Sequence, residues 1–140
     1  MTEKIMQTFW TNHIKKSPPE RSEVWELKYT KGISIPFDAV KDHQIDALLL
    51  AKFKGLYHKL TDPPVFYGQQ TRFNVKRPFD CMFIKMVDAY VLLWFYKPRQ
   101  PKVFIKIDIE EFLAEKKRSL RKSLTEDVAL KIGTTVSIVK

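Results

Sequence analysis

EVWELKYT, residues 23–30, has the alternation of polar and apolar side chains, and the frequent branched and aromatic residues, that are typical of a β-strand. This pattern predicts a β-strand whose successive side chains point to opposite faces of a sheet. Glu26 and Lys28 would share one face, and the other face would carry three apolar residues, Trp25, Leu27 and Tyr29. The strand would therefore present a carboxylate and a lysine side by side.

Apolar residues at helical spacing lie on both sides of this strand. Residues 3 to about 15 have the pattern of an amphipathic helix, which would end before Pro18-Pro19. After a turn marked by Gly32 and Pro36, we expect a second helix from about 39 to 54. Asp38 would cap its start and Gly55 would end it.

The middle of the chain predicts a loop followed by strands. Residues 56–60 resemble a short strand, and the loop at about 61–78 contains three prolines and a glycine. Strands are expected at about 79–85, 89–96 and 103–109. The second of these is apolar enough to be buried on both faces, so it should be central in the sheet.

The C-terminal part predicts a helix at 110–117, then a basic segment and a further helix within 116–132. Ser123 and Glu126 have capping-box spacing before that helix, and residues 134–139 could add a last strand. Together these elements predict one α/β domain, residues 1–140, with a central mixed sheet flanked by helices.

Charge and composition limit the partners and the location. Lys and Arg outnumber Asp and Glu by 25 to 16, and a formal net charge of +9 favours a polyanion such as nucleic acid. Many small basic proteins bind no nucleic acid, so charge alone decides nothing. Cys81 is the only cysteine, which excludes an internal disulfide and favours the cytoplasm. The longest apolar run, Ala89–Tyr96, is far shorter than the roughly 20 residues that span a bilayer.

The pair Glu26 and Lys28 suits hydrolysis of a phosphodiester. A carboxylate can hold a divalent metal ion, and a lysine on the same strand face can orient the attacking water. The triplet is not specific alone, because Glu115-Lys116-Lys117 matches it as well, in a predicted helix that would not aim both groups together. The alternative for Glu26 and Lys28 is an exposed charge pair on a strand.

The surrounding sequence adds a resemblance. Residues 25–49, WELKYTKGISIPFDAVKDHQIDALL, are similar to RecU-type Holliday junction resolvases of the PD-(D/E)XK nuclease superfamily. The shared features are the E-x-K strand, a basic turn at Lys31, the Ser34-Ile35-Pro36 step and a helix that carries His43-Gln44.

This resemblance implies a restriction-endonuclease-like fold and a Mg²⁺- or Mn²⁺-dependent DNA endonuclease. It implies catalytic roles for Glu26, Lys28 and Gln44, and metal ligation by Glu26 and the backbone carbonyl of Leu27. The family places an aspartate before the E-x-K strand, but residues 21–25 contain none. Asp80, in RPFDCMFIK, is the candidate to replace it as a catalytic metal ligand. Asp62 and Glu3 are weaker acidic candidates.

The resemblance also implies branched DNA or a four-way junction as substrate, a homodimer, and a cytoplasmic place in a bacterium or a phage-infected cell. The aromatic residues Phe66, Tyr67 and Phe73 could stack on bases. The expected DNA contacts are basic residues near the site, in the loop and after 115, namely Lys31, His43, Lys59, Arg72, Lys76, Arg77, Lys116, Lys117, Arg118, Arg121 and Lys122. The alternative is a non-catalytic nucleic-acid-binding protein of the same fold, active in recombination or phage DNA processing.

Overall fold

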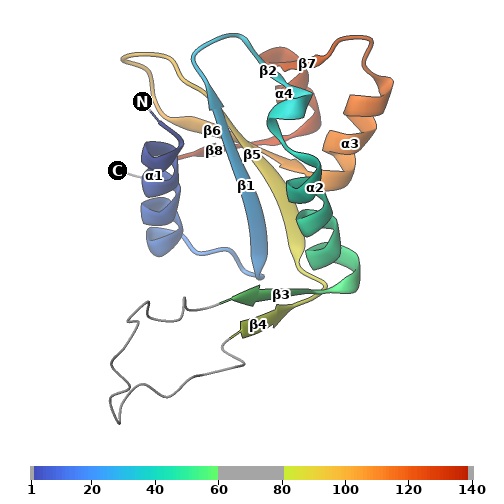
Figure 1. Ribbon diagram of the computed structural model, residues 1–140. Helices are drawn as coiled ribbons and strands as arrows, with labels where there is room; N and C mark the ends of the chain where they lie inside the picture. Colours follow the sequence, from blue (N-terminus) through green and yellow to red (C-terminus); the bar gives the residue numbers. More distant parts are fainter. Residues whose placement is uncertain (1, 60–80, 139–140) are drawn as a thin grey trace, which may run out of the picture.

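A four-stranded mixed sheet forms the centre of the computed structural model, which describes residues 2–59 and 81–138. The strands lie in the order β1-β5-β6-β8, and Figure 1 shows them between helices on either side. β1 is parallel to β5, whereas β5 and β6 are antiparallel, as are β6 and β8. Their bounds are Glu23–Thr30 for β1, Asp88–Phe95 for β5, Val103–Asp108 for β6 and Thr134–Ser137 for β8. The mixed α/β class is confirmed.

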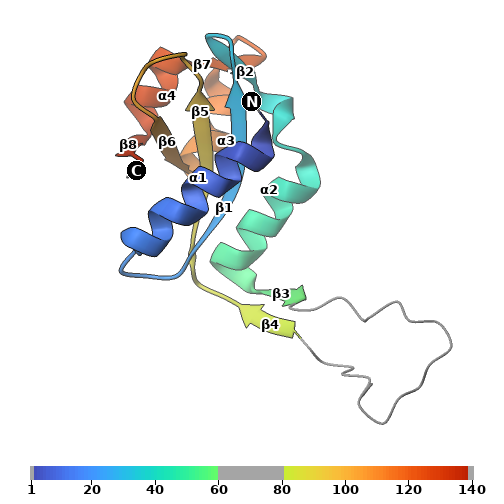
Figure 2. The same ribbon diagram turned by 90° about the vertical axis from the view of Figure 1, so that its left-hand side faces the viewer.

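Helices cover both faces of the sheet. Helix α1 (Glu3–Lys16) lies across one face, and α2 (Asp42–Leu49) lies on the other side of β1, as Figures 1 and 2 show. The face opposite α1 also packs against α3 (Ile109–Arg118) and α4 (Glu126–Ile132). None of the helices within the described part of the chain has the length and apolar character needed to cross a membrane.

The alternation along β1 sends its side chains to two separate cores. Val24 packs with the core under α2, α3 and α4, whereas Trp25, Leu27 and Tyr29 pack with Met6 and Trp10 of α1. β5 is central, as its apolar sequence predicted, because its side chains enter both cores. β1 is at the end of the strand order, so Glu26 and Lys28 lie on an edge strand of this sheet.

Two short ribbons lie outside the main sheet. β2 (Ser34–Pro36) pairs with β7 (Ser123–Thr125), and β3 (Leu56–Lys59) pairs with β4 (Cys81–Ile84). A 3-10 turn (η1, Phe37–Ala39) follows β2, and a π-helical turn (η2, Leu50–Lys54) connects α2 to Gly55 and β3. Figure 1 shows β3 and β4 beyond one end of the sheet. The sequence predicted β3 and β4 but not β2 or β7, and it did not predict that these strands pair apart from the main sheet.

Two predicted caps were wrong. Asp38 lies in the 3-10 turn, and the residue before α2 is Lys41, whose backbone N–H is bonded by the side chain of Gln44 at 2.9 Å. Ser123 pairs in β7 with Pro36, and Thr125 precedes α4. Ser123 is used in long-range pairing by ribbon β2–β7, which local spacing does not reveal, whereas Asp38 lies in the 3-10 turn that follows β2.

Candidate functional site

The carboxylate of Glu26 and the ammonium of Lys28 meet on one face of β1. Glu26 Oε1 lies 3.0 Å from Lys28 Nζ. Their side chains are 23% and 13% exposed, so the ion pair is partly removed from water. A charge interaction in such a setting is stronger than on an open surface. The alternation of β1 therefore brings the two predicted residues together.

Gln44 joins this pair from the first turn of α2. Its amide Nε2 donates to Glu26 Oε1 at 2.7 Å. Its Oε1 accepts from the backbone N–H of Lys41 at 2.9 Å, and this contact fixes which end of the amide faces the site. Gln44 thus stabilises the start of α2 and positions Glu26 with one side chain.

Glu3, at the start of α1, approaches the same lysine from the other side of the sheet edge. Its Oε1 lies 3.5 Å from Lys28 Nζ, and its side chain is exposed. Because β1 is an edge strand of the sheet, Lys28 can reach toward α1 as well as Glu26. The sequence named Glu3 as a weak acidic candidate, and the structure places it beside Lys28.

One carboxylate of this cluster suits a divalent cation. Lys28 and Gln44 both contact Glu26 Oε1, and a cation could bind through the second carboxylate oxygen, Oε2. No group of three His, Cys, Asp or Glu close enough to hold a metal occurs within residues 2–59 and 81–138. Mg²⁺ often binds one or two carboxylates, with water and substrate phosphate as its other ligands. Glu26 fits that chemistry as one ligand.

The other proposed ligands stay predictions. Asp80 lies outside the described residues, as does Asp62. Leu27 lies in β1 with its side chain in the core under α1. Its carbonyl belongs to the backbone of an edge strand of the sheet.

The predicted DNA contacts near the site are separate from the Glu26 cluster. Lys31 and His43 are exposed, and neither is bonded to Glu26. Lys59 belongs to β3, with a side chain that is not described. The loop candidates Arg72, Lys76 and Arg77 lie outside the described residues, as do the aromatic candidates Phe66, Tyr67 and Phe73.

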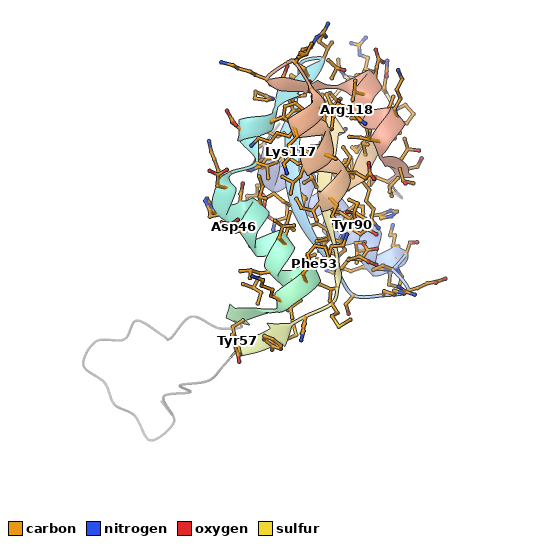
Figure 3. The ribbon with its side chains drawn as sticks, turned by 90° about the vertical axis from the view of Figure 1, so that its right-hand side faces the viewer. Asp46, Phe53, Tyr57, Tyr90, Lys117 and Arg118 are labelled. Carbon is orange, nitrogen blue, oxygen red and sulfur yellow. The ribbon has the colours of Figure 1, made fainter. Side chains whose placement is uncertain are left out.

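The basic segment after Glu115 is partly neutralised. Lys116 Nζ lies 3.6 Å from an Asp38 carboxylate oxygen, and the Arg118 guanidinium pairs with Glu115. Lys117 is exposed on α3, as are Arg121 and Lys122 after it. Figure 3 shows Lys117 and Arg118 on α3, away from the end that carries Phe53 and Tyr57.

The sequence missed a second charged cluster, near the start of β1 and the end of β6. Lys52 Nζ bonds Asp108 and Glu110 at 2.8–2.9 Å, and Lys106 Nζ bonds Glu23 at 2.6 Å. Lys106 also lies 4.1 Å from the centre of the Tyr90 ring. The residues of this second cluster are far apart in the chain, so no local sequence motif indicates it.

This second cluster changes two pKa values. Burial raises the pKa of the Tyr90 phenol, and the charges of Asp88 and Glu23 raise it further. Burial lowers the pKa of Lys52, but its bonds to Asp108 and Glu110 outweigh burial and give a net increase. Both groups are held in their protonated forms, which suits a structural role.

Comparisons with protein-family models, with curated proteins and with solved structures found no match.

Proposed function

We propose that this chain is a divalent-metal-dependent endonuclease that cuts branched DNA at the Glu26 cluster. The observation that carries the proposal is the position of Glu26 Oε1, 3.0 Å from Lys28 Nζ and 2.7 Å from Gln44 Nε2. A carboxylate, a cation and an amide donor thus converge on an edge strand of the sheet. The net charge of +9 supports a polyanionic substrate.

Each residue has a role that its chemistry permits. Glu26 would bind the metal through its carboxylate, and Gln44 would hold that carboxylate in one orientation. Lys28 would donate a hydrogen bond to the attacking water or to a phosphate oxygen, where negative charge develops. The bound metal would supply a Lewis acid and a more acidic water. Asp80 is our candidate for the second carboxylate.

The finer assignments belong to the same proposal. A restriction-endonuclease-like fold is supported by a mixed sheet between helices, with the E-x-K strand parallel to its neighbour. A homodimer would place two such sites on the two strands of a four-way junction. The exposed cations Lys31 and Lys117 could add contacts to the DNA backbone, which would contribute affinity without sequence preference.

The test is cleavage of a labelled four-way junction while Mg²⁺ or Mn²⁺ is titrated against a chelator. We expect metal-dependent cleavage by the wild type and a loss of at least about a hundredfold in Glu26→Gln, with junction binding retained. Glu111→Gln is the control, because it removes an exposed carboxylate on α3, and should cleave like the wild type.

Two outcomes would contradict the nuclease. Cleavage that is unchanged in Glu26→Gln would remove Glu26 from the reaction. Junction binding without cleavage at any metal concentration would favour the non-catalytic nucleic-acid-binding protein. Asp80→Asn tests the second ligand separately: if it cleaves normally while Glu26→Gln does not, another acid completes the site.

A further inference from the structure

An aromatic pair is exposed on ribbon β3–β4, at the end of the molecule beyond the sheet. Tyr57 and Phe83 are opposite each other in the antiparallel register, with ring centres 4.9 Å apart. Tyr57 is 73% exposed and Phe83 is 51% exposed. Figure 3 shows Tyr57 and Phe53 at this end. Clustered exposed apolar side chains of this kind mark interaction sites on soluble proteins.

The backbone holds the pair in place. Gly55 has a φ of 113°, which strongly favours glycine, and the Phe83 ring packs directly against it. A Cβ at this position would lie 2.3 Å from Phe83 Cζ. The absence of a side chain at residue 55 therefore leaves room for the tip of the Phe83 ring against the backbone. The aromatic surface is formed before any partner binds.

The charge around the pair selects an anionic partner. Residues 50–59 and 81–87 contain four lysines and no aspartate or glutamate. Lys52 is paired with Asp108 and Glu110, but Lys54 and Lys85 are exposed on either side of the ribbon sequence. A second copy of the same surface would be repelled by these charges. An anion with flat apolar faces, such as a nucleic acid with unpaired bases, matches both features.

We propose that unpaired nucleotides of a nucleic acid stack on Tyr57 and Phe83, with Lys54 and Lys85 near their phosphates. Base stacking on aromatic rings tolerates any sequence, because every base has a π-face. Binding at this surface needs no metal ion, so it goes beyond the nuclease proposed above. It adds a substrate class: DNA with an unpaired stretch, such as a fork or an open junction.

The distance between Gln44 and Lys54 sets the length of DNA strand that could contact both residues. Helix α2 and turn η2 connect Gln44 to Gly55, and a helical rise of about 1.5 Å per residue separates Gln44 from Lys54 by roughly 15 Å. Stacked bases are about 3.4 Å apart along a strand, so that distance corresponds to roughly four to five nucleotides. A strand that contacts both Gln44 and Lys54 would therefore span roughly that number of nucleotides between them.

Fluorescence anisotropy in EDTA tests the proposal on the full chain. The probes are a fluorescein-labelled oligodeoxythymidylate of about 15 nucleotides and a blunt duplex of the same length. We expect Tyr57→Ala to weaken single-strand binding by roughly five- to a hundredfold and duplex binding by less than about twofold. Tyr57→Phe should bind like the wild type, since it keeps the ring.

Matched variants separate stacking from charge and from folding. Leu130→Ala removes an exposed apolar side chain on α4 and should bind both probes normally. Lys54→Gln should lower the slope of log affinity against log salt concentration by about 0.7 for the single strand. Tyr57→Trp adds an exposed indole, and we expect the oligonucleotide to quench its fluorescence. Quenching would show that the base contacts residue 57 in a variant that still folds and binds.

Two results would overturn the proposal. One is equal single-strand affinity in the wild type and in Tyr57→Ala, together with no quenching in Tyr57→Trp. The aromatic surface would then be assigned to a protein partner instead. The other is an equal loss for both probes in Tyr57→Ala, which would show no preference for unpaired bases. Because EDTA is present throughout, neither result depends on whether Glu26 catalyses cleavage.

Discussion

The two E-x-K triplets of this chain lie in opposite structural settings. In β1, Glu26 and Lys28 lie on one face with 3.0 Å between carboxylate and ammonium. In α3, Glu115 is buried and pairs with Arg118, whereas Lys117 is exposed. A spacing of two residues aligns side chains on a strand, but on a helix it turns them about 200° apart. The same spacing therefore brings a carboxylate and an ammonium together in β1 and not in α3.

The largest expected effect concerns the two lysines of these triplets. Lys28→Ala should reduce cleavage of a four-way junction by at least about a hundredfold, because the ammonium beside Glu26 is lost. Lys117→Ala should reduce it less than about twofold at moderate salt, as it removes one exposed charge. Initial cleavage rates at saturating metal measure both. Equal losses in the two variants would mean that the strand placement has no catalytic meaning.

The placement of Glu26 and Lys28 could be predicted because it depends on a short-range rule. Alternation over residues 23–30 determines both the strand and its faces, and the structure confirms both. The apolar run at 89–96 likewise predicted a central strand. Such patterns can be read from a short segment, because each position is apolar or polar according to whether that residue faces the core or the solvent.

Pairing between distant segments could not be predicted in the same way. Nothing near Ser123 indicates that it will pair with Pro36, and nothing near Lys52 indicates that it will bond Asp108. The exposed aromatic pair depends on Tyr57 and Phe83 meeting across a ribbon. For the site, the structure places Gln44 beside Glu26, but the catalytic role that the resemblance implies for Gln44 stays a prediction, and Asp80 lies outside the described residues.

A smaller effect is expected at Gln44, which separates positioning from capping. Gln44→Glu keeps an acceptor for the Lys41 N–H but places a second negative charge beside Glu26, so cleavage should fall by about tenfold to a hundredfold. Gln44→Ala should show a similar loss and also lower the free energy of unfolding by about 1 kcal/mol, since the contact at the helix start is lost. Cleavage rates and urea unfolding test this. A loss of stability without a loss of cleavage would show that Gln44 only stabilises the start of α2 and does not position Glu26 for the reaction.

A third carboxylate–lysine group lies away from both triplets, where Lys52 bonds both Asp108 and Glu110. Lys52→Met should lower the free energy of unfolding by about 1–2 kcal/mol at neutral pH and leave cleavage unchanged. The bonds to Asp108 and Glu110 raise the folded-state pKa of Lys52 above its ordinary 10.5, against the effect of burial. Its contribution is therefore complete below that pH and is lost as the pH rises through the folded-state pKa.

Urea unfolding of the wild type and Lys52→Met, at neutral pH and again above pH 10.5, measures that dependence. The difference between the two proteins should shrink at the higher pH. A difference that grows with pH would show that the ion pairs of Lys52 do not stabilise the fold.

The smallest effect is expected at Glu3, and it tests how far the cluster extends across the sheet edge. Its carboxylate is 3.5 Å from Lys28 Nζ and its side chain is 57% exposed, so water and salt screen the interaction. Glu3→Gln should change the cleavage rate by about twofold to threefold at low salt, and by less as salt is added. Lys4→Gln, one residue further along α1, is the control. A loss as large as that of Glu26→Gln would make Glu3 a metal ligand, and the site would then extend from α1 to α2 around the edge of β1.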